Sequence, residues 1–365
     1  MKKQFLFLSF ALLTLASCSN DEETNPVANT PAAASNVAIK QPTVGGANQP
    51  NQVFLDLSSE TLTPVNRSSW DFGFSSGSDF RVVINGSIKM AVKQLATSDI
   101  TLTQTSDASV SVGAGTNPAS KGYCDNPTGV LTGASAGFGT AIAEVSVNDA
   151  DNKVYLVNLG FAVSTTTPNV GSVSIDGDSR GWKKVRFLRN GNGYKIQYAN
   201  LDSATYTEKT IAKDTDFNFT FFNLNSGTTV AVEPQKAKWD VCFTIFTNYF
   251  NMGAGEVTYG FSDFITTNMK GGTKAYQVLT SEFTYDAFTK AKIVEANFTT
   301  SATDQRIIGS NWRIGGGPST LPSVKTDRFY VVKDVTGNYY KIKFLAMTND
   351  AGVRGNPTIQ YTILN

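Results

Sequence analysis

The chain of 365 residues contains no histidine. This absence excludes a Ser-His-Asp triad, a Cys-His dyad, His-ligated zinc and the HExxH helix of metalloproteases. A general base would have to be Asp, Glu, Lys or Tyr, and no constellation of these residues stands out in the sequence. We therefore expect that the protein is not an enzyme.

Charged residues are also scarce. They make up 17% of the chain, whereas soluble domains usually contain about 25%. The 31 Lys and Arg nearly balance the 30 Asp and Glu, and the sequence has no basic stripe, so nucleic acid is not an expected partner. Gly, Thr, Ser, Asn and aromatic residues are abundant instead, and this mixture favours strands and tight turns over helices.

Long hydrophobic runs are missing except near the N-terminus. Two lysines precede an apolar run over residues 5–16, which is too short to span a bilayer. The run leads into Cys18 in an order that resembles the lipoprotein box of bacteria. We predict a lipoprotein signal peptide over residues 1–18 with the lipid on Cys18. The alternative is an ordinary signal peptide in which this cysteine is a coincidence.

The segment that follows Cys18 has the composition of a tether. Residues 21–23 form an acidic cluster that resembles the surface-export signal of Bacteroidetes lipoproteins. Residues 19–50 are rich in Pro, Ala, Asn and Gly and show no hydrophobic period, so we predict a disordered linker. The expected location is the outer membrane, with the domains lipid-anchored either at the cell surface or facing the periplasm.

A Trp-Asp motif occurs twice in the chain. Residues 69–74 and 238–243 both contain it, and each copy follows a similar strand and turn. A second pair of similar segments lies downstream, at 184–196 and 327–342. The spacing is far longer than the period of about 20–50 residues of solenoid repeats. The sequence therefore predicts two tandem domains, over residues 51–212 and 213–365.

Apolar and polar residues alternate in many segments of both domains. Tyr340, Ile342 and Phe344 alternate with two lysines, and residues 194–198 show the same period. Asn and Gly between such segments favour tight hairpins. The most helix-like segment, 281–294, could equally be two strands. We predict an all-β protein made of antiparallel domains.

Cys124 and Cys242 are the two cysteines besides Cys18. An oxidising compartment would allow them to pair. They fall in different repeats, however, and a disulfide would require the two domains to lie close together. The sequence therefore favours two unpaired thiols.

Three motifs allow both a structural and a ligand-binding interpretation. In each Trp-Asp pair, we expect the indole in the core and the carboxylate either in solvent or bonded to a neighbouring loop. The glycines of 315–317 form either a plain loop or a surface that a flat ligand approaches closely. Met252 and Met269 flank an aromatic segment, and a thioether is either a packing group or a soft axial ligand of haem iron.

These features together resemble the HmuY family of haem-binding lipoproteins. The resemblance rests on both Trp-Asp motifs, on residues 79–86, and on the second-repeat segments 309–318 and 328–344. It implies an all-β fold, haem as cargo, iron acquisition and a TonB-dependent outer-membrane receptor as partner. The founding member ligates haem through two histidines, and in this chain those positions fall near Tyr285 and on Gly316.

Two functions follow from this resemblance. In the first, the protein binds haem through Met252, Met269 or Tyr285, or by apolar packing alone. In the second, the same fold has lost its haem ligands and serves as a haem-independent surface binding or adhesion module. No sequence motif identifies the ligand of such a module.

Overall fold

The computed structural model describes residues 37–365 apart from 114–117, 134–138, 252, 254 and 318–319. The predicted signal peptide, Cys18 and most of the predicted linker lie outside these residues. Residues 37–365 form one compact unit. Because Thr, Val and aromatic residues dominate the alternating segments, this unit is built from antiparallel strands joined by turns and short 3-10 helices. The predicted all-β class is confirmed.

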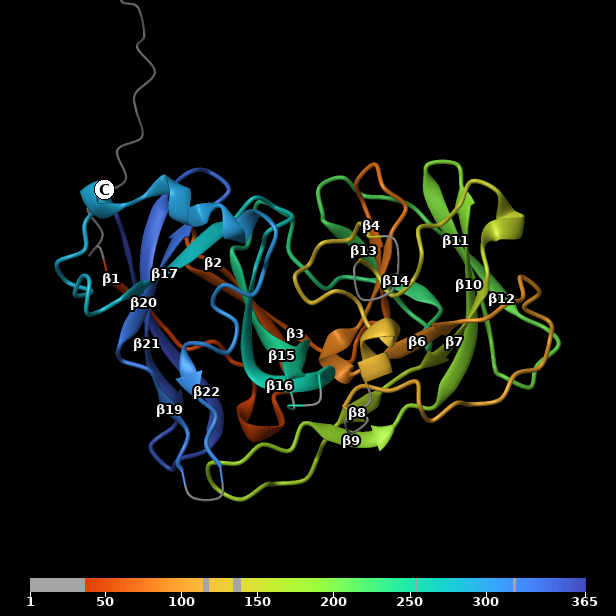
Figure 1. The fold of residues 1–365 in the computed structure, drawn as a ribbon, viewed down its shortest axis with the longest axis horizontal. Helices are drawn as coiled ribbons and strands as arrows, with labels where there is room; N and C mark the ends of the chain where they lie inside the picture. The colour runs from red at the N-terminus through yellow and green to blue at the C-terminus, as the bar shows by residue number, and fades with distance from the viewer. Residues whose placement is uncertain (1–36, 114–117, 134–138, 252, 254, 318–319) are drawn as a thin grey trace, which may run out of the picture. The chain divides into compact units, whose positions relative to one another are not determined.

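In the described part of the chain, the strands form four main sheets and two small ones (Figure 1). Two of these sheets have five strands each. In spatial order, the strands of one are β1 (Val37–Lys40), β22 (Arg354–Ile363), β21 (Tyr339–Thr348), β20 (Arg328–Lys333) and β17 (Lys274–Leu279). The strands of the other are β12 (Thr207–Ile211), β11 (Gly193–Ala199), β10 (Trp182–Asn190), β7 (Val154–Asn158) and β6 (Ala91–Gln94). Two further sheets have four strands each. The first contains, in spatial order, β14 (Thr228–Val230), β13 (Phe219–Asn223), β4 (Phe72–Ser75) and β5 (Val82–Ile84). The second contains β16 (Glu256–Thr267), β15 (Val241–Asn251), β2 (Asn51–Asp56) and β3 (Thr61–Asn66).

Two-stranded sheets and 3-10 helices complete the fold. The small sheets pair β18 (Arg313–Ile314) with β19 (Ser323–Val324) and β8 (Phe161–Val163) with β9 (Asp176–Ser179). The 3-10 helices are η1 (Gly46–Asn48), η2 (Gly86–Ile88), η3 (Pro118–Tyr123), η4 (Asp149–Asp151), η5 (Lys290–Lys292), η6 (Glu295–Phe298) and η7 (Thr300–Ala302). The segment 281–294 contains η5 and turns, so neither a long helix nor two strands form there.

The N-terminal hairpins of the two repeats are exchanged. The first hairpin, β2–β3, pairs with β15 of the second repeat, and the second hairpin, β13–β14, pairs with β4 of the first repeat. In Figure 1 the early strands β2 and β3 accordingly lie beside β15 and β16, and β13 lies beside β4. Each repeat therefore receives its neighbour's hairpin into its own sheet.

The two main hydrophobic cores follow this exchange. One core contains Phe72 and Phe187 of the first repeat together with Phe222 and Leu224 of the second hairpin. The other contains residues of β20, β21 and β22 together with Leu55 and its neighbours in the first hairpin. Because each core is completed by a strand pair from the other repeat, neither repeat contains a whole core of its own.

Residues 37–50, which the composition assigns to the disordered linker, are instead ordered. β1 pairs with β22 along its whole length, from Val37 opposite Thr362 to Lys40 opposite Ile359. Val44 is buried in the core of the second repeat. Pairing with the last strand supplies the backbone hydrogen bonds that this segment's weak hydrophobic pattern does not predict.

Candidate functional site

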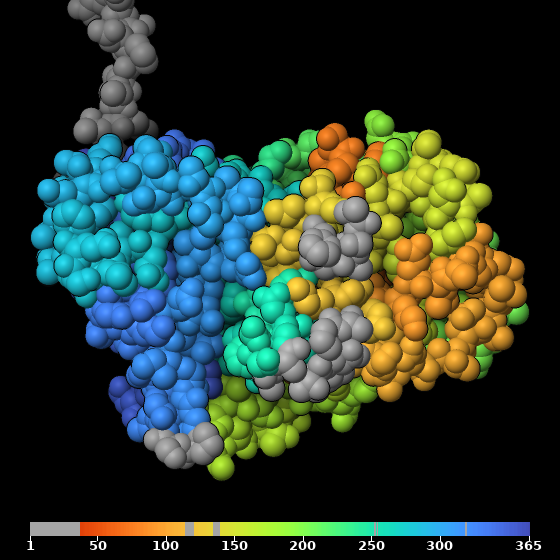
Figure 2. Space-filling model, in the orientation of Figure 1, coloured from red at the N-terminus to blue at the C-terminus, as the bar shows by residue number. Residues whose placement is uncertain are grey.

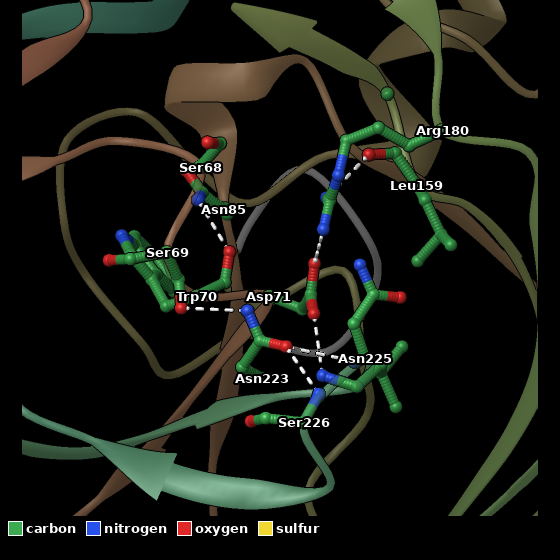
Figure 3. Close-up of polar contacts among 12 residues, drawn as sticks. Ser68, Ser69, Trp70, Asp71, Asn85, Leu159, Arg180, Asn223, Asn225 and Ser226 are labelled. Carbon is green, nitrogen blue, oxygen red and sulfur yellow. Dashed lines mark hydrogen bonds and ion pairs between the residues drawn. The ribbon is translucent and has the colours of Figure 1, made fainter.

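Each Trp-Asp motif immediately precedes the strand that receives an exchanged hairpin. Asp71 is fully buried, and its Oδ2 accepts a hydrogen bond from Leu224 N of the second hairpin at 2.7 Å. Its Oδ1 lies 2.7 Å from Arg180 Nη2 (Figure 3). Asn223 Nδ2 adds a bond to Ser69 O at 2.8 Å. These contacts hold the turn of the second hairpin against the first repeat.

Asp240 holds the turn of the first hairpin against the second repeat in the same way. Its Oδ2 accepts from Leu57 N at 2.9 Å and its Oδ1 accepts from Thr273 Oγ1 at 3.0 Å. Burial raises the pKa of Asp240 to about 6. Of the two environments that the sequence allows for these carboxylates, the contact with a neighbouring loop is the correct one, and both aspartates are structural.

The two tryptophans lie at the contact between the repeats. Trp70 packs edge-to-face on Phe221 with ring centroids 4.8 Å apart, and Trp239 packs in the same way on Phe54 at 5.1 Å. In both pairs the phenylalanine comes from the exchanged hairpin. Edge-to-face pairs of this kind stabilise a contact beyond the area that they bury.

A cavity of about 200 Å³ lies beside these aromatic pairs, lined by residues of both repeats. Cys124 and Cys242 line it as free thiols, as the sequence predicts. Burial raises the pKa of both thiols well above the usual range. Because the thiolate is the reactive form, these cysteines are not poised as nucleophiles.

The long hairpin of β15 and β16 carries an exposed aromatic face. Phe246 lies opposite Phe261 across the hairpin, and Phe250 and Tyr259 belong to the same face. The rings of Tyr259 and Phe261 lie 5.2 Å apart, and those of Phe250 and Tyr259 lie 6.1 Å apart. Tyr259 is 52% exposed and Phe250 is 45% exposed. Clustered exposed aromatic side chains mark binding surfaces more often than scattered ones do.

The free edge of β16 lies against loops of the first repeat. Thr258 N donates to Ser120 Oγ at 3.1 Å, Gly113 N donates to Thr258 O at 3.1 Å, and Lys121 Nζ lies 2.7 Å from a carboxylate oxygen of Glu256. Figure 2 shows residues of this hairpin against those loops on one face of the molecule. The first repeat therefore holds the aromatic hairpin in place.

A groove of about 590 Å³ runs beside the aromatic face. Tyr259 and Phe261 line it together with three cationic side chains, Lys89, Arg313 and Arg354. A second groove of about 780 Å³ shares Arg354 and two glycines of the 315–317 run with the first. The aromatic face and these grooves together form the candidate site.

One carboxylate serves two guanidinium groups at this groove. Asp263 pairs with Arg354, and its Oδ2 lies 3.9 Å from Arg313 Nε. Asp263 lies at a bulge in β16 and has a left-handed φ of 49°, which turns its side chain toward the arginines. Lys89 pairs with Asp176. The three cations at the groove and the two carboxylates of Asp263 and Asp176 thus carry a net charge of one positive unit.

The glycine run forms one edge of the groove. Gly316 has a φ of +78°, and a Cβ at this position would lie 3.0 Å from Thr320 O. Gly317 N donates to Thr320 O at 2.9 Å. Glycine at 316 is therefore required by the loop, and the loop borders a groove wide enough for a flat ligand.

Two of the three sequence-derived haem-ligand candidates, Met269 and Tyr285, belong to the described residues, and neither lines the grooves. Met252 lies outside the described residues. Met269 is half-buried in the turn after β16. Tyr285 is buried, its hydroxyl donates to Lys341 O at 3.0 Å and lies 3.1 Å from Thr362 Oγ1, and burial raises its pKa to about 12.

Tyr259, Phe250 and Arg313 are the site residues that sequence reasoning missed. A signal for Tyr259 was present, because Tyr259 and Phe261 alternate with small and polar residues along one strand. Arg313 carries no such signal, since its position beside Tyr259 depends on the bulge at Asp263.

Within the described residues, no group of three or more Cys, Asp or Glu side chains is placed to hold a metal ion. No described helix is long and apolar enough to cross a membrane. The fold and the site define an all-β protein of two repeats with an aromatic and cationic groove.

A family model described as "HmuY protein" matches residues 48–211 and again 215–361, so the chain belongs to the HmuY family and contains two tandem copies. Two solved structures are similar to it. The apo HmuY analog of Tannerella forsythia is 19% identical, with a TM-score of 0.24, over 46% of this chain and 88% of that one. Apo PinO from Porphyromonas gingivitis is 11% identical, with a TM-score of 0.24, over 91% of this chain and 99% of that one. No curated protein matches the chain.

Proposed function

We propose that this protein binds haem or a related porphyrin for iron acquisition and is not an enzyme. Membership of the HmuY family supports the proposal. The observation that carries it is the groove in which exposed aromatic rings of β16 lie beside cationic side chains. A porphyrin has flat apolar faces and two propionates, and this groove offers groups suited to both.

The apolar contacts would come from the aromatic face of the hairpin. Phe250 is exposed and Phe261 lines the groove, so a macrocycle packed on these two rings would bury apolar area that now faces water. On the opposite edge, Gly315 and Gly316 have no side chains to hold a flat ligand away.

The propionates would be bound by the cationic wall. Arg313 and Arg354 share the single carboxylate of Asp263, and this excess positive charge favours an anionic group. Arginine is suited to this role because its planar fork matches a carboxylate.

The iron would be held by an oxygen or a sulfur, since the chain has no histidine. We propose the Tyr259 phenol as the ligand, because it is exposed at the groove and tyrosinate ligates ferric haem. Met252, Met269 and Tyr285 remain sequence-derived candidates. Tyr285 would first have to give up its hydrogen bonds to Lys341 and Thr362.

The same proposal includes the anchor and the partner. A lipid on Cys18 would tether the folded unit to the outer membrane, at the cell surface or facing the periplasm. A TonB-dependent outer-membrane receptor would then take haem from the groove.

Haemin titration of the chain from residue 19, followed by absorption spectroscopy, tests haem binding. We expect a shifted Soret band in the wild-type chain and loss of the tyrosinate spectrum in Tyr259→Phe. Tyr206→Phe is the matched control, because Tyr206 is a similarly exposed tyrosine of the first repeat, and its spectrum should be unchanged. Met252→Ala, Met269→Ala and Tyr285→Phe complete the series.

Two outcomes would contradict the proposal at different levels. An unchanged spectrum in Tyr259→Phe together with a change in one of the other variants would move the ligand to that residue. No Soret shift in the wild-type chain would reject haem binding. It would favour a haem-independent surface module, for which pull-down from cells grown with and without iron identifies the partner.

A further inference from the structure

A third groove, of about 730 Å³, is lined by Lys213, Lys236 and Lys270. This lysine groove shares no residue with the two grooves beside the aromatic face. From its charge and its unused hydrogen-bond donors, we infer that it binds a small polyanion, a molecule that carries two or three carboxylate or phosphate groups. This inference does not depend on haem binding.

Connections from both repeats form the walls of the lysine groove. The loop between β4 and β5 and the turn at Asn192 belong to the first repeat. The connection between β12 and β13, which joins the two repeats, contributes Lys213. Lys236 precedes β15 and Lys270 follows β16 in the second repeat. The groove therefore exists only where the two repeats are assembled.

The positive charge of this groove has no counter-charge in its lining. Three lysines line it and no Asp or Glu does. The lysine ion pairs in the described part of the chain all involve other lysines. Like charges that face one groove repel each other, and a bound anion relieves this repulsion.

The same connections contain four acidic residues, none of which lines the groove: Asp79, Asp214, Asp216 and Glu233. Asp79 Oδ1 accepts a hydrogen bond from Ser75 Oγ at 2.5 Å, and Glu233 Oε1 accepts one from Phe219 N at 2.9 Å. Burial lowers the pKa of Lys213, and the charge of Asp79 offsets this effect only in part. Asp79 therefore does not replace a bound anion.

Lys213 is held in position before any ligand binds. Its Nζ donates to Gly77 O at 2.6 Å and to Asp79 O at 2.7 Å, and it lies 3.8 Å from the centroid of the Phe80 ring. An ammonium group has three N–H donors, so one remains for a ligand. A side chain that is already fixed loses little conformational freedom on binding.

Lys236 and Lys270 have more donors to offer. Lys236 Nζ donates to Thr215 O at 2.6 Å, which leaves two N–H groups. Lys270 Nζ makes no hydrogen bond with the described residues and lies 5.3 Å from the centroid of the Phe219 ring. Each of the three ammonium groups can therefore donate to an anionic oxygen.

This arrangement selects the number of anionic groups on the ligand. The three lysines come from three different connections, so a molecule with several anionic groups matches them better than a molecule with one. Lysine is a compact charge with rotatable donors, which suits carboxylates and phosphates alike. The groove also has the volume of a small-molecule site, which is typically about 300–1,000 Å³.

Calorimetric titration of the chain from residue 19 at low salt tests the inference with two pairs of probes. Tricarballylate has three carboxylates and butyrate has one, and inorganic triphosphate and inorganic phosphate form the second pair. In at least one pair the polyanion should bind about tenfold more tightly, because hydrogen bonds between charged groups are the stronger kind. The pair with the larger difference identifies the bound group as carboxylate or phosphate.

Lys270→Gln is the diagnostic variant, because it breaks no hydrogen bond or ion pair among the described residues. It should weaken polyanion binding about tenfold and leave the Soret band with haemin unchanged. Lys238→Gln is the matched control, since Lys238 is also exposed but does not line the groove. Its affinity should change by less than about twofold. Equal losses in the two variants would show attraction by overall charge and would overturn the site.

A second measurement does not rely on the variants. In the ¹⁵N-labelled wild-type chain, the polyanion should shift the backbone amide resonance of Asn192, which lines the groove. The resonance of Asn338, in the equivalent turn of the second repeat, should stay in place. An equal shift at Asn338 would contradict the assigned site. Failure of tricarballylate and triphosphate to bind at millimolar concentration would overturn the inference.

Discussion

Asp71 and Asp240 occupy equivalent positions in the two repeats but have different charged neighbours. Both accept a hydrogen bond from the backbone of an exchanged hairpin. Asp71 also pairs with Arg180, whereas Asp240 has a hydroxyl, Thr273 Oγ1, in the corresponding place. The duplicated motif therefore preserves one function, the attachment of a hairpin, with two electrostatic solutions.

This difference predicts unequal effects of the same substitution. Asp71→Asn leaves Arg180, whose side chain is only 11% exposed, without its counter-charge and should lower the free energy of unfolding by about 3 kcal/mol. Asp240→Asn removes no ion pair and keeps an oxygen for Leu57 N. It also removes a carboxylate whose pKa burial raises to about 6, so at pH 7 it should cost about 1 kcal/mol at most and can be neutral. Urea unfolding of the two variants at pH 7 measures both values. Equal losses would show that the ion pair with Arg180 is not what distinguishes the two sites.

Glu233 is the buried carboxyl beside the cavity with the clearest consequence for pH. Burial raises its pKa from 4.5 to about 7, and Lys270 lowers it in part. The folded chain therefore binds this proton more tightly than the unfolded chain does. The resulting stability is fully present below about pH 4.5 and is lost as the pH rises toward 7.

Glu233→Gln should therefore reduce the fall in stability between pH 5 and pH 8. A shift of this size corresponds to about 3 kcal/mol at most, and the glutamine oxygen still accepts from Phe219 N. Thermal unfolding across this pH range should show a flatter profile for the variant, which should be more stable than the wild-type chain at pH 8. Glu282→Gln, at an exposed position, is the control. A variant profile parallel to that of the wild type would contradict the raised pKa.

At the scale of elements, the sequence predicts strands well because alternation is a local property. The alternating residues around Tyr340 and Tyr194 do lie in β21 and β11. The sequence does not predict which repeat each hairpin pairs with. Leu57 and Leu224 present the same backbone group to Asp240 and Asp71, so the residue pattern fits exchanged and unexchanged pairing equally well.

The short connection after β3 distinguishes the two pairings in the structure. Ser69 N donates to Asn66 O at 3.1 Å, which makes a turn directly before β4. After this turn the chain enters β4, which pairs with β13 and β5 and does not pair with β2. The edge of β2 pairs with β15 instead. Turn geometry of this kind depends on tertiary contacts, such as those of Arg67 with Gln49 O and Ser87 O.

The candidate site shows the same limit of sequence reasoning. Aromatic alternation along β16 is visible in the sequence, whereas the groove also needs Lys89 of the first repeat and Arg354 of the last strand. These residues are distant in the chain and meet only in the fold. Tyr285 illustrates the converse, because its place in an approximate register suggested a ligand while its hydroxyl is bonded within a core.

At the scale of the whole molecule, the exchange makes the two repeats depend on each other. The first repeat lacks Phe222 and Leu224 of its core without the second hairpin, and the second repeat lacks Leu55 without the first. β1, at the N-terminal side of the first repeat, also pairs with β22 in the five-stranded sheet of the second repeat. We therefore expect one cooperative unfolding transition for residues 37–365, in contrast to the separate transitions of independent tandem domains.

Separation of the chain between residues 212 and 213 tests this dependence. The fragments 37–212 and 213–365, expressed alone, should lack native near-ultraviolet circular dichroism, because each loses the strands that complete its sheet and core. Expressed together, they should associate and recover the spectrum of the intact chain, since both hairpins are again present. The intact chain from residue 37 is the control. If each fragment folds alone into a stable monomer, the hairpins can pair within their own repeat, and the exchange is not required for folding.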